Sequence, residues 1–474
     1  MPCELILTDH AAPLYCEKLA RIIPGKRAVV FGKWQNQDIV AKLFYGSSKA
    51  KLQAERDAAG SEILSSSQVP TPKLYCQTTV KNRNIHVLIF ERIKNAISLD
   101  DLWQNKNNTD ELLPFLDTTI IELATQHVLG ILQKDLHLKN FVFSGEKIYS
   151  IDGGSIQKFP GPLPKKESLN HLALFFSQLG LGTQELQQRL FDIYVKLRGW
   201  IVKPQDIDQL NKMIYQYNRK RLADYRKKIW RNCSAFKKVT TILSNIIYDK
   251  NYQTNHFLNI LKHPKQCFAN QATILKAGRS STVAKVVIDG KTFIIKRYNI
   301  KNIWHFLRRF FRPTRAAHSW HVANQLWLMG VATAKPIATI EKRFLGIRAT
   351  SYFIMKPLEG MHLGEYFADF NEQDPRFLQM AQRVVSLFNH LLHLKLSHGD
   401  LKTTNIIVHN EQPWLIDLDG VKKHMTQFSL KRAFKKDLKR FMRNWENQPS
   451  IHRMFSELYT HFDNLTRCEN KYFF

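Results

Sequence analysis

Three oxygen-bearing side chains recur at the same spacing in the two halves of this sequence. In the first half, Asp135 precedes Asn140 by five residues, and Asn140 precedes Asp152 by twelve. The second half repeats both intervals with Asp400, Asn405 and Asp417. Phosphoryl transfer requires such a set: a carboxylate that orients the acceptor hydroxyl, and an amide oxygen and a second carboxylate that hold Mg²⁺.

A lysine stands in a β-like apolar run upstream of each motif. Lys42 lies in DIVAKLFY and Lys296 lies in KTFIIKRY, 93 and 104 residues before the first aspartate of the corresponding motif. An ammonium group placed there can neutralise nucleotide phosphates. Each half therefore carries the residue types of a phosphoryl-transfer site.

The elements that must position these residues are repeated as well. Short apolar runs, FVF with IYSI and IIV with WLI, separate each asparagine from the second aspartate and predict a pair of strands. After each lysine comes a helix-like stretch and a turn with proline, SSSQVPTPKL at 65–74 and LMGVATAKPI at 328–337. Two copies of one fold are the simplest account of this order.

These residues resemble the eukaryotic-type protein kinase fold. More narrowly, the second half from about 270 through DLKRFMRNW, with HGDLKTTNIIV and LIDLDG, resembles the bacterial lipopolysaccharide kinase family of Kdo and heptose kinases. The first half, with GKRAVVFGKWQNQDIVAKLF and RDAAGSEIL, resembles a diverged member of that family. The resemblance implies an α+β fold of two tandem bilobal domains, each with a small β-rich lobe and a larger helical lobe. We expect these domains at 1–235 and 268–474, with a connecting segment at 236–267.

The resemblance also implies roles for individual residues. Asp400 would orient or deprotonate the acceptor hydroxyl, Lys296 would bind the α- and β-phosphates of ATP, and Mg²⁺ would be held by Asn405 and Asp417. The matching residues of the first half are Asp135, Lys42, Asn140 and Asp152. The adenine would lie at or near segments 355–360 and 90–93.

Both halves depart from the kinase pattern around the phosphates. KAGRSSTVAKV keeps only Gly278, Ser280 and Ser281 of a glycine-rich loop, and the first half offers Gly25 and Gly32. Asp57 stands where the kinase fold has the helix glutamate that pairs with the lysine, and Glu55 and Glu62 are nearby candidates for the same role. The second half has no acidic residue from Gly290 to Ile340, so Lys296 must find its partner elsewhere, and Asp417 is one candidate.

The residues before the catalytic aspartate differ between the halves. They read Gln133-Lys134 in the first half and His398-Gly399 in the second, and the histidine commonly braces this loop in kinases. We expect the second domain to be the likelier catalyst. The first domain is either active on another acceptor or a pseudokinase that braces its neighbour.

Composition restricts the class of protein. The 474 residues include 70 Lys and Arg against 40 Asp and Glu, a formal charge of +30, with 44% hydrophobic residues, which excludes an intrinsically disordered chain. Six scattered cysteines favour a reducing compartment, and no apolar run predicts a signal peptide or a membrane-spanning helix. The expected location is the cytoplasm.

The positive charge favours anionic partners, namely nucleic acid, acidic lipid or phosphorylated glycans. Nucleic acid is the weaker interpretation, because no reader motif accompanies the basic runs. Segment 304–312 mixes Trp, Phe and Arg, so it fits an interfacial membrane segment or the buried stripe of a helix. The basic runs at 218–231 and 422–443 could contact membrane or oligosaccharide, or be solvated helix faces.

The predicted function is ATP- and Mg²⁺-dependent phosphorylation of a sugar hydroxyl in the lipopolysaccharide inner core. The expected partner is lipopolysaccharide core or another phosphorylated glycolipid, at the cytoplasmic face of the inner membrane as a peripheral protein. Two alternatives stay open: a protein or small-molecule kinase, and a non-catalytic pseudokinase scaffold in envelope assembly. The sequence specifies neither the acceptor sugar nor the oligomeric state.

Overall fold

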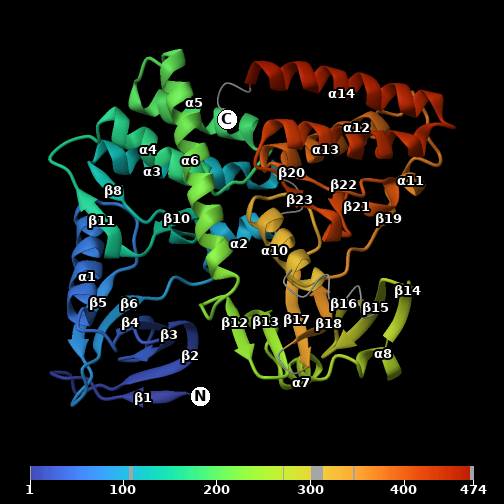
Figure 1. Ribbon diagram of the computed structural model, residues 1–474. Coiled ribbons are helices and arrows are strands. Elements are labelled where there is room, and N and C mark those ends of the chain that lie inside the picture. Colours follow the sequence, from blue (N-terminus) through green and yellow to red (C-terminus); the bar gives the residue numbers. More distant parts are fainter. Residues whose placement is uncertain (1, 106–109, 271, 300–312, 345–346, 470–474) are drawn as a thin grey trace. The chain divides into compact units, whose positions relative to one another are not determined.

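The computed structural model describes residues 2–105, 110–270, 272–299, 313–344 and 347–469. The chain divides into two compact units (Figure 1). Unit 1 comprises Met1–Leu179 and Thr183–Asn218, and unit 2 comprises Gly180–Gly182 and Arg219–Phe474. Each unit combines β-sheets with helices, which confirms the mixed α and β composition predicted from the sequence.

Unit 1 begins with a six-stranded antiparallel sheet in the order β1-β2-β3-β4-β6-β5. In β3, for example, buried side chains alternate with partly or fully exposed ones, so one face supplies apolar residues to a core. Helix α1 (Ala50–Ser66) packs on this sheet through Ala54 and Ala58. The strands are β1 (Cys3–Leu5), β2 (Leu14–Ile23), β3 (Arg27–Trp34), β4 (Gln37–Phe44), β5 (Leu74–Thr79) and β6 (His86–Glu91).

The rest of unit 1 is mainly helical. Its core gathers aromatic and aliphatic side chains, among them Phe141, Phe175 and Tyr194. The helices are α2 (Leu99–Gln104), α3 (Leu113–Val128), α4 (Lys165–Phe176), α5 (Gln184–Arg198) and α6 (Pro204–Lys228), which continues into unit 2. The short strands are β7 (Ile97–Ser98), β8 (Ile131–Gln133), β9 (Phe141–Ser144), β10 (Lys147–Ser150) and β11 (Ile156–Lys158).

Unit 2 contains a seven-stranded antiparallel sheet in the order β12-β13-β17-β18-β16-β15-β14. The segment at 236–267, expected as a connection, instead supplies β12, β13 and helix α7. The apolar run in β13 explains this difference, because Ile246 and Ile247 are buried in the unit's cores. The elements are β12 (Phe236–Thr240), β13 (Ser244–Asp249), α7 (Asn255–Lys262), α8 (Cys267–Asn270), β14 (Ala272–Ala277), β15 (Ser281–Ile288), β16 (Lys291–Tyr298), β17 (Pro336–Phe344) and β18 (Ile347–Met355).

Helix α10 (Arg315–Leu328) begins at Thr314, whose hydroxyl accepts a hydrogen bond from the Ala317 N–H. It contacts β17 and β18, and Trp320 on it is fully buried. The other helices of unit 2 are α11 (Leu363–Tyr366), α12 (Pro375–His393), α13 (Gln427–Met442) and α14 (Pro449–Glu469). The short strands are β19 (Met361–His362), β20 (Leu396–Ser397), β21 (Ile406–His409), β22 (Gln412–Leu415) and β23 (Lys422–Lys423).

The two large sheets share the order of five strands. Read across each sheet, β2-β3-β4-β6-β5 of unit 1 corresponds to β14-β15-β16-β18-β17 of unit 2. Lys42 lies on β4 and Lys296 on β16, which are the corresponding middle strands. In each unit a hairpin, β9–β10 or β21–β22, then carries the asparagine at its start and the second aspartate just after its end.

Single-turn 3-10 helices flank these hairpins and connect other elements. They are η1 (Asp110–Leu112), η2 (Leu138–Asn140), η3 (Gly153–Ser155), η4 (Lys250–Tyr252), η5 (Thr403–Asn405), η6 (Leu418–Gly420) and η7 (Arg443–Trp445). Segment 304–312, for which two interpretations were open, lies outside the described residues. In the part of the chain that the structure describes, every helix is too short or too polar to cross a bilayer.

Candidate active site

Lys296 is a buried cation that meets two carboxylates at the end of β16. Its side chain is 9% exposed, and its Nζ atom lies 2.6 Å from Asp417 Oδ1 and 2.9 Å from Asp419 Oδ2. The strand fixes its direction, because Lys296 pairs with Val283 on β15 and Phe353 on β18. The acidic partners that α10 does not provide therefore come from the turn after β22.

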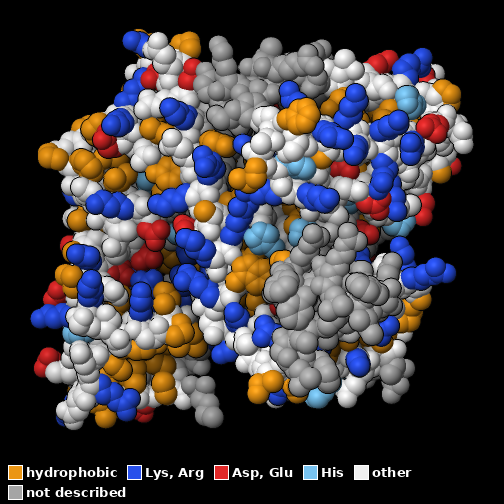
Figure 2. Space-filling model, viewed as in Figure 1, with side chains coloured by type: hydrophobic (Ala, Val, Ile, Leu, Met, Phe, Trp, Pro, Cys, Tyr) orange, Lys and Arg blue, Asp and Glu red, His pale blue; other side chains and the backbone are white. Residues whose placement is uncertain are grey.

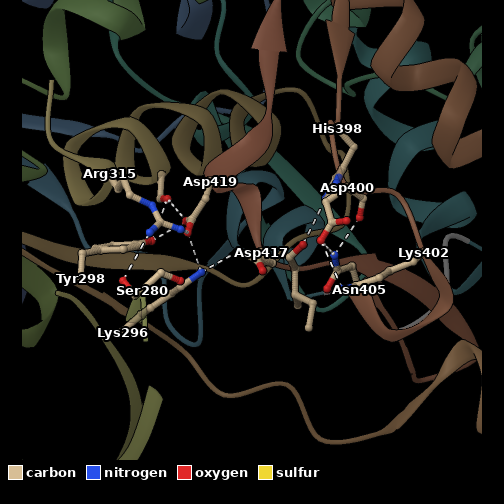
Figure 3. Close-up of polar contacts among 12 residues, drawn as sticks. Ser280, Lys296, Tyr298, Arg315, His398, Asp400, Lys402, Asn405, Asp417 and Asp419 are labelled. Atoms are coloured by element: carbon tan, nitrogen blue, oxygen red, sulfur yellow. Dashed lines mark hydrogen bonds and ion pairs between the residues drawn. The ribbon is translucent and has the colours of Figure 1, made fainter. Parts of the chain in front are cut away.

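Asp419 is surrounded by hydrogen-bond donors (Figure 3). Its Oδ2 atom also accepts from Arg315 at 2.7 Å, and its Oδ1 atom accepts from Tyr298 at 2.5 Å and Ser319 at 2.8 Å. Burial would raise the pKa of this carboxyl, but Lys296, Tyr298 and Arg315 outweigh burial and hold it below its usual value. Asp419 thus joins the lysine strand to helix α10.

Asp400 lies on the loop after β20, beside Asn405. The Asn405 Nδ2 atom donates to Asp400 O at 2.7 Å and to Asp400 Oδ2 at 3.2 Å. Lys402 Nζ lies 3.3 Å from Oδ2, and Arg440 on α13 donates to Oδ1. Although burial opposes it, these contacts lower the pKa of Asp400, so the carboxylate stays ionised at neutral pH.

The backbone just before Asp400 is held by a second buried carboxylate, that of Asp437 on α13. It accepts from the backbone N–H of His398 at 2.6 Å and of Gly399 at 2.9 Å, and its residue is 4% exposed. Gly399 has φ +81, and an added Cβ would lie 2.5 Å from Gly420 O. This position therefore requires glycine, as the sequence has it.

Asp417 ends the hairpin in a left-handed conformation, with φ 58, and precedes η6. The Ile416 N–H donates to Asn405 O at 3.0 Å, which fixes the spacing between the asparagine and the second aspartate. Figure 3 shows Asp417 between Lys296 on one side and Asn405 with Asp400 on the other. The four side chains predicted to act together in unit 2 thus lie around one site.

The residues fit a magnesium ion in their donor chemistry. Because the Nδ2 atom of Asn405 donates to Asp400, the Oδ1 atom of the same amide group points away from that hydrogen bond. An amide oxygen and the Asp417 carboxylate are oxygen ligands of the kind that Mg²⁺ prefers, with phosphate oxygens or water completing the set. Among the described residues, no three His, Cys, Asp or Glu side chains cluster as a metal site.

The short loop before β15 lies beside Arg315. The Gly278 N–H donates to Ser281 O at 3.0 Å, which closes the turn, and Arg315 donates to Ser280 O at 3.3 Å. Arg315 thereby links this loop to Asp419. The segment predicted to contact adenine begins where β18 ends, and there the Lys356 N–H donates to Lys335 O.

In unit 1 the lysine partner lies on the helix instead. Lys42 Nζ lies 2.9 Å from Asp57 Oδ1 and 2.8 Å from Asp57 Oδ2, and 3.5 Å from Asp152 Oδ1. Arg27 approaches the same carboxylates at 3.5 and 3.6 Å. Burial would raise the pKa of Asp152, but Lys42 and Arg27 lower it. Lys42 also lies over the ring of Phe90, the first residue of the segment predicted to contact adenine.

The loop of Asp135 repeats the local geometry of the second unit. Asn140 Nδ2 donates to Asp135 O at 3.0 Å, and the Ile151 N–H donates to Asn140 O at 2.8 Å. Asp152 is left-handed, like Asp417. The carboxylate of Asp135 differs, since it is 78% exposed and pairs with His137 at 3.1 Å, a hydrogen bond that lowers its pKa.

Residues 266–461 match the model of the Lipopolysaccharide kinase (Kdo/WaaP) family. The predicted resemblance of the second half is confirmed. The matched region lies within unit 2 and includes Lys296, Asp400, Asn405 and Asp417. A search of curated proteins finds no match for this chain.

Several residues around the kinase-family site were not predicted. Asp419, Arg315 and Tyr298 surround Lys296, while Arg440 and Asp437 contact the loop of Asp400. The sequence carried one signal for Asp419. It is the second acidic residue of LIDLDG, two positions after Asp417, and helix α10 has no acidic residue that could pair with Lys296 instead. Nothing local marked Asp437, which is one acid within a basic run.

Proposed function

We propose that this protein is an ATP-dependent phosphotransferase that phosphorylates a sugar hydroxyl of the lipopolysaccharide inner core. The observation that carries the proposal is the arrangement of Lys296, Asp417 and Asp400 within the region that matches the lipopolysaccharide kinase family. Phosphoryl transfer depends on positioning and charge neutralisation, and these residues supply both. ATP is the proposed phosphate donor, because the matched family is a kinase family.

In this proposal Lys296 binds the α- and β-phosphates, and Asp400 orients the acceptor hydroxyl. Because its pKa is lowered, Asp400 is a weak base, so positioning is its main contribution to the rate. Mg²⁺, held by Asn405 and Asp417, would neutralise charge on the transferred phosphoryl group. Gly278, Ser280 and Ser281 lie on the loop that would face the phosphates.

We further propose that the two units are kinase-like bilobal domains that arose by duplication. The shared strand order, the two lysine strands and the two matched hairpins support this. Strand β13 pairs with β17, and β12 pairs with β13, so we assign the segment at 236–267 to the second domain rather than to a connection. Asp135, Lys42, Asn140 and Asp152 are then the counterparts of the second site.

The two domains differ in the features that catalysis needs, and we propose the second as the main catalyst. In unit 1, Arg27 contacts both Asp57 and Asp152, and Gln133 replaces the histidine before the catalytic aspartate. With these differences, unit 1 would either act on another acceptor or be a pseudokinase that braces the second domain. Asp57 would position Lys42 in either case.

The decisive experiment measures transfer of the γ-phosphate of ATP to core lipopolysaccharide by the purified protein. We expect Asp400→Ala to abolish transfer and the matched variant Asp135→Ala to leave most of it. Full transfer by Asp400→Ala would refute the assignment of the second site. Loss in Asp135→Ala alone would instead assign the reaction to unit 1.

Two rival functions have their own tests. Ser- and Thr-containing peptides, offered beside glycolipid, separate a protein kinase from the proposed activity. A thermal-shift assay with ATP and Mg²⁺ tests the scaffold alternative, because a ligand that binds the folded state raises the unfolding temperature. A shift that Lys296→Met removes supports the nucleotide site of unit 2, and no shift at saturating nucleotide favours the scaffold.

We propose that the protein acts at the cytoplasmic face of the inner membrane as a peripheral protein. The acceptor is a glycolipid in this proposal, and the chain carries a formal charge of +30, which favours anionic surfaces. Fractionation of cells into soluble and membrane parts, with a salt wash of the membranes, tests the location.

A further inference from the structure

Helix α13 has one apolar face and one basic face. Its buried residues are Leu430, Phe434, Asp437 and Phe441, which recur at helical spacing, and Phe434 and Phe441 belong to the core of unit 2. Half of the remaining twelve positions are Lys or Arg. The helix is therefore a packed element on one side and a charged surface on the other.

The basic face extends beyond the helix at both ends. The exposed cations of this face and its flanks are Lys422, Lys423, Lys431, Arg432, Lys435, Lys436, Lys439, Arg440 and Arg443. The one acidic residue between 422 and 443 is Asp437, which is 4% exposed and turned inward. Figure 2 shows Lys and Arg side chains gathered over the part of unit 2 that carries α13.

Two large apolar side chains stand at the start of this basic face. Met425 is 86% exposed and Phe428 is 75% exposed. Single exposed apolar residues are ordinary on protein surfaces. Here two of them, three residues apart, adjoin a dense set of cations, and this combination is typical of segments that lie in a membrane interface.

We propose that the basic face of α13, with Met425 and Phe428, docks on the surface of an anionic lipid bilayer. The lysines and arginines would contact lipid phosphates, and the two apolar side chains would enter the acyl boundary. A soluble polyanion such as RNA would satisfy the cations but would leave Met425 and Phe428 in water. The apolar pair is therefore the observation that favours lipid.

The docking surface leads to the candidate active site. Arg440 on the same helix donates to Asp400. Phe428 and Arg440 are twelve residues apart, which corresponds to about 18 Å along an α-helix. Docking would thus hold Asp400 near the lipid headgroups, where a membrane-borne acceptor lies, and this consequence rests on the proposed function.

Co-sedimentation of the full chain with lipid vesicles tests the proposal. The protein should bind vesicles of phosphatidylcholine and phosphatidylglycerol in a two-to-one ratio, and should not bind phosphatidylcholine alone. Met425→Ser with Phe428→Ser should weaken binding by about tenfold or more, because it removes the inserted apolar area. Lys431→Gln with Lys435→Gln should also weaken binding about tenfold and reduce its salt dependence.

Matched controls come from other surfaces of unit 2. Ile242→Ser with Leu243→Ser removes two apolar side chains that are 83% and 66% exposed, and Lys265→Gln with Lys285→Gln removes two exposed cations. Both controls should bind as the wild type does. The proposal is overturned if the wild type binds neither vesicle, if the Met425 and Phe428 variant binds normally, or if the controls weaken binding equally.

A second readout separates lipid from soluble polyanions. The Met425→Ser and Phe428→Ser variant should bind RNA as the wild type does, since its cations are intact; an equal loss for RNA and vesicles would contradict a lipid role for the apolar pair. Asp400→Asn should still bind vesicles. If the wild type binds vesicles but transfers no phosphate, the proposed function is refuted while the docking surface stands.

Discussion

Asp419 lies 2.9 Å from Lys296 and has the place in unit 2 that Asp57 has beside Lys42 in unit 1. The two carboxylates come from different elements, Asp57 from helix α1 and Asp419 from the turn after β22. The position that corresponds to Asp419 in unit 1 is Gly154, where an added Cβ would lie 3.9 Å from Asp57 Cγ. The acid has thus moved from the helix to the turn, while its contact with the lysine is kept.

This exchange predicts that Asp419→Asn disables the second site. The variant leaves Lys296 and Arg315 near a neutral amide, and loss of a buried ionic partner should lower the free energy of unfolding by about 2–4 kcal/mol. Phosphate transfer should fall about 100-fold, with a raised KM for ATP. Urea unfolding and steady-state kinetics measure both effects.

The exposed Asp369→Asn is the control and should change neither quantity. A sharper test moves the acid back to the helix. Ser319 on α10 donates to Asp419 at 2.8 Å, so Ser319→Asp in an Asp419→Gly background should recover part of the lost stability. If the double variant is no more stable than Asp419→Gly alone, the two positions are not interchangeable.

Asp437→Ala should destabilise unit 2 and slow transfer without changing nucleotide affinity. The substitution leaves the buried N–H groups of His398 and Gly399 without their acceptor, at a cost of about 2–4 kcal/mol. The backbone before Asp400 would lose its anchor, so kcat should fall while the KM for ATP stays the same. Glu446→Ala, at an exposed position shortly after the end of α13, serves as the control. Unchanged kcat in a folded Asp437→Ala protein would contradict the anchoring role.

The sequence predicted those parts of the site whose contacts are local. Asn405 reaches Asp400 five residues away, and a hairpin of fixed length sets the distance to Asp417, so spacing alone carried this information. The absence of acids on the helix after Lys296 indicated a partner elsewhere, and Asp417 was correctly named as a candidate.

The contacts that could not be predicted join distant parts of the chain. Asp419 meets Arg315 across 104 residues, and Asp437 meets Gly399 across 38 residues. Such contacts depend on how α10 and α13 pack, which spacing does not encode. The pairing of β13 with β17 was missed for the same reason, because the partner strand lies about ninety residues further along the chain.

Gly60→Ala should damage unit 1 at its candidate metal loop. A Cβ at position 60 would lie 1.9 Å from Gly153 O, and this backbone follows Asp152 directly. Such overpacking costs about 1–3 kcal/mol or more, because backbone has to move. Gly161→Ala is the matched control, since an added Cβ there meets no atom within 4 Å and φ is not positive. Equal unfolding midpoints for the two variants would show that α1 can shift without cost.

Acid should destabilise unit 1 through two buried histidines. His171 donates from Nε2 to Gln133 O at 2.8 Å and contacts His127 at 2.7 Å, and His127 contacts Tyr194 at 2.6 Å. This chain holds the loop before Asp135, as Asp437 holds the corresponding loop of unit 2. Burial lowers the pKa of His171 to about 4 and that of His127 well below its ordinary value.

The direction in which stability changes with pH follows from proton uptake. An unfolded histidine has a pKa near 6.5, so between about pH 6.5 and 4 the unfolded state binds more protons than the folded state, and stability falls as pH falls. For His171 alone the loss at about pH 4.5 is on the order of 2–3 kcal/mol. His171→Gln keeps a donor and an acceptor but cannot be protonated, so the stability of this variant should depend less on pH across this window.

Urea unfolding near pH 7 and pH 4.5, with hydrogen exchange of α4 reporting on unit 1, measures the difference. His86→Gln, outside this network, is the control, and a pH dependence of His171→Gln equal to that of the wild type would exclude His171 as the source.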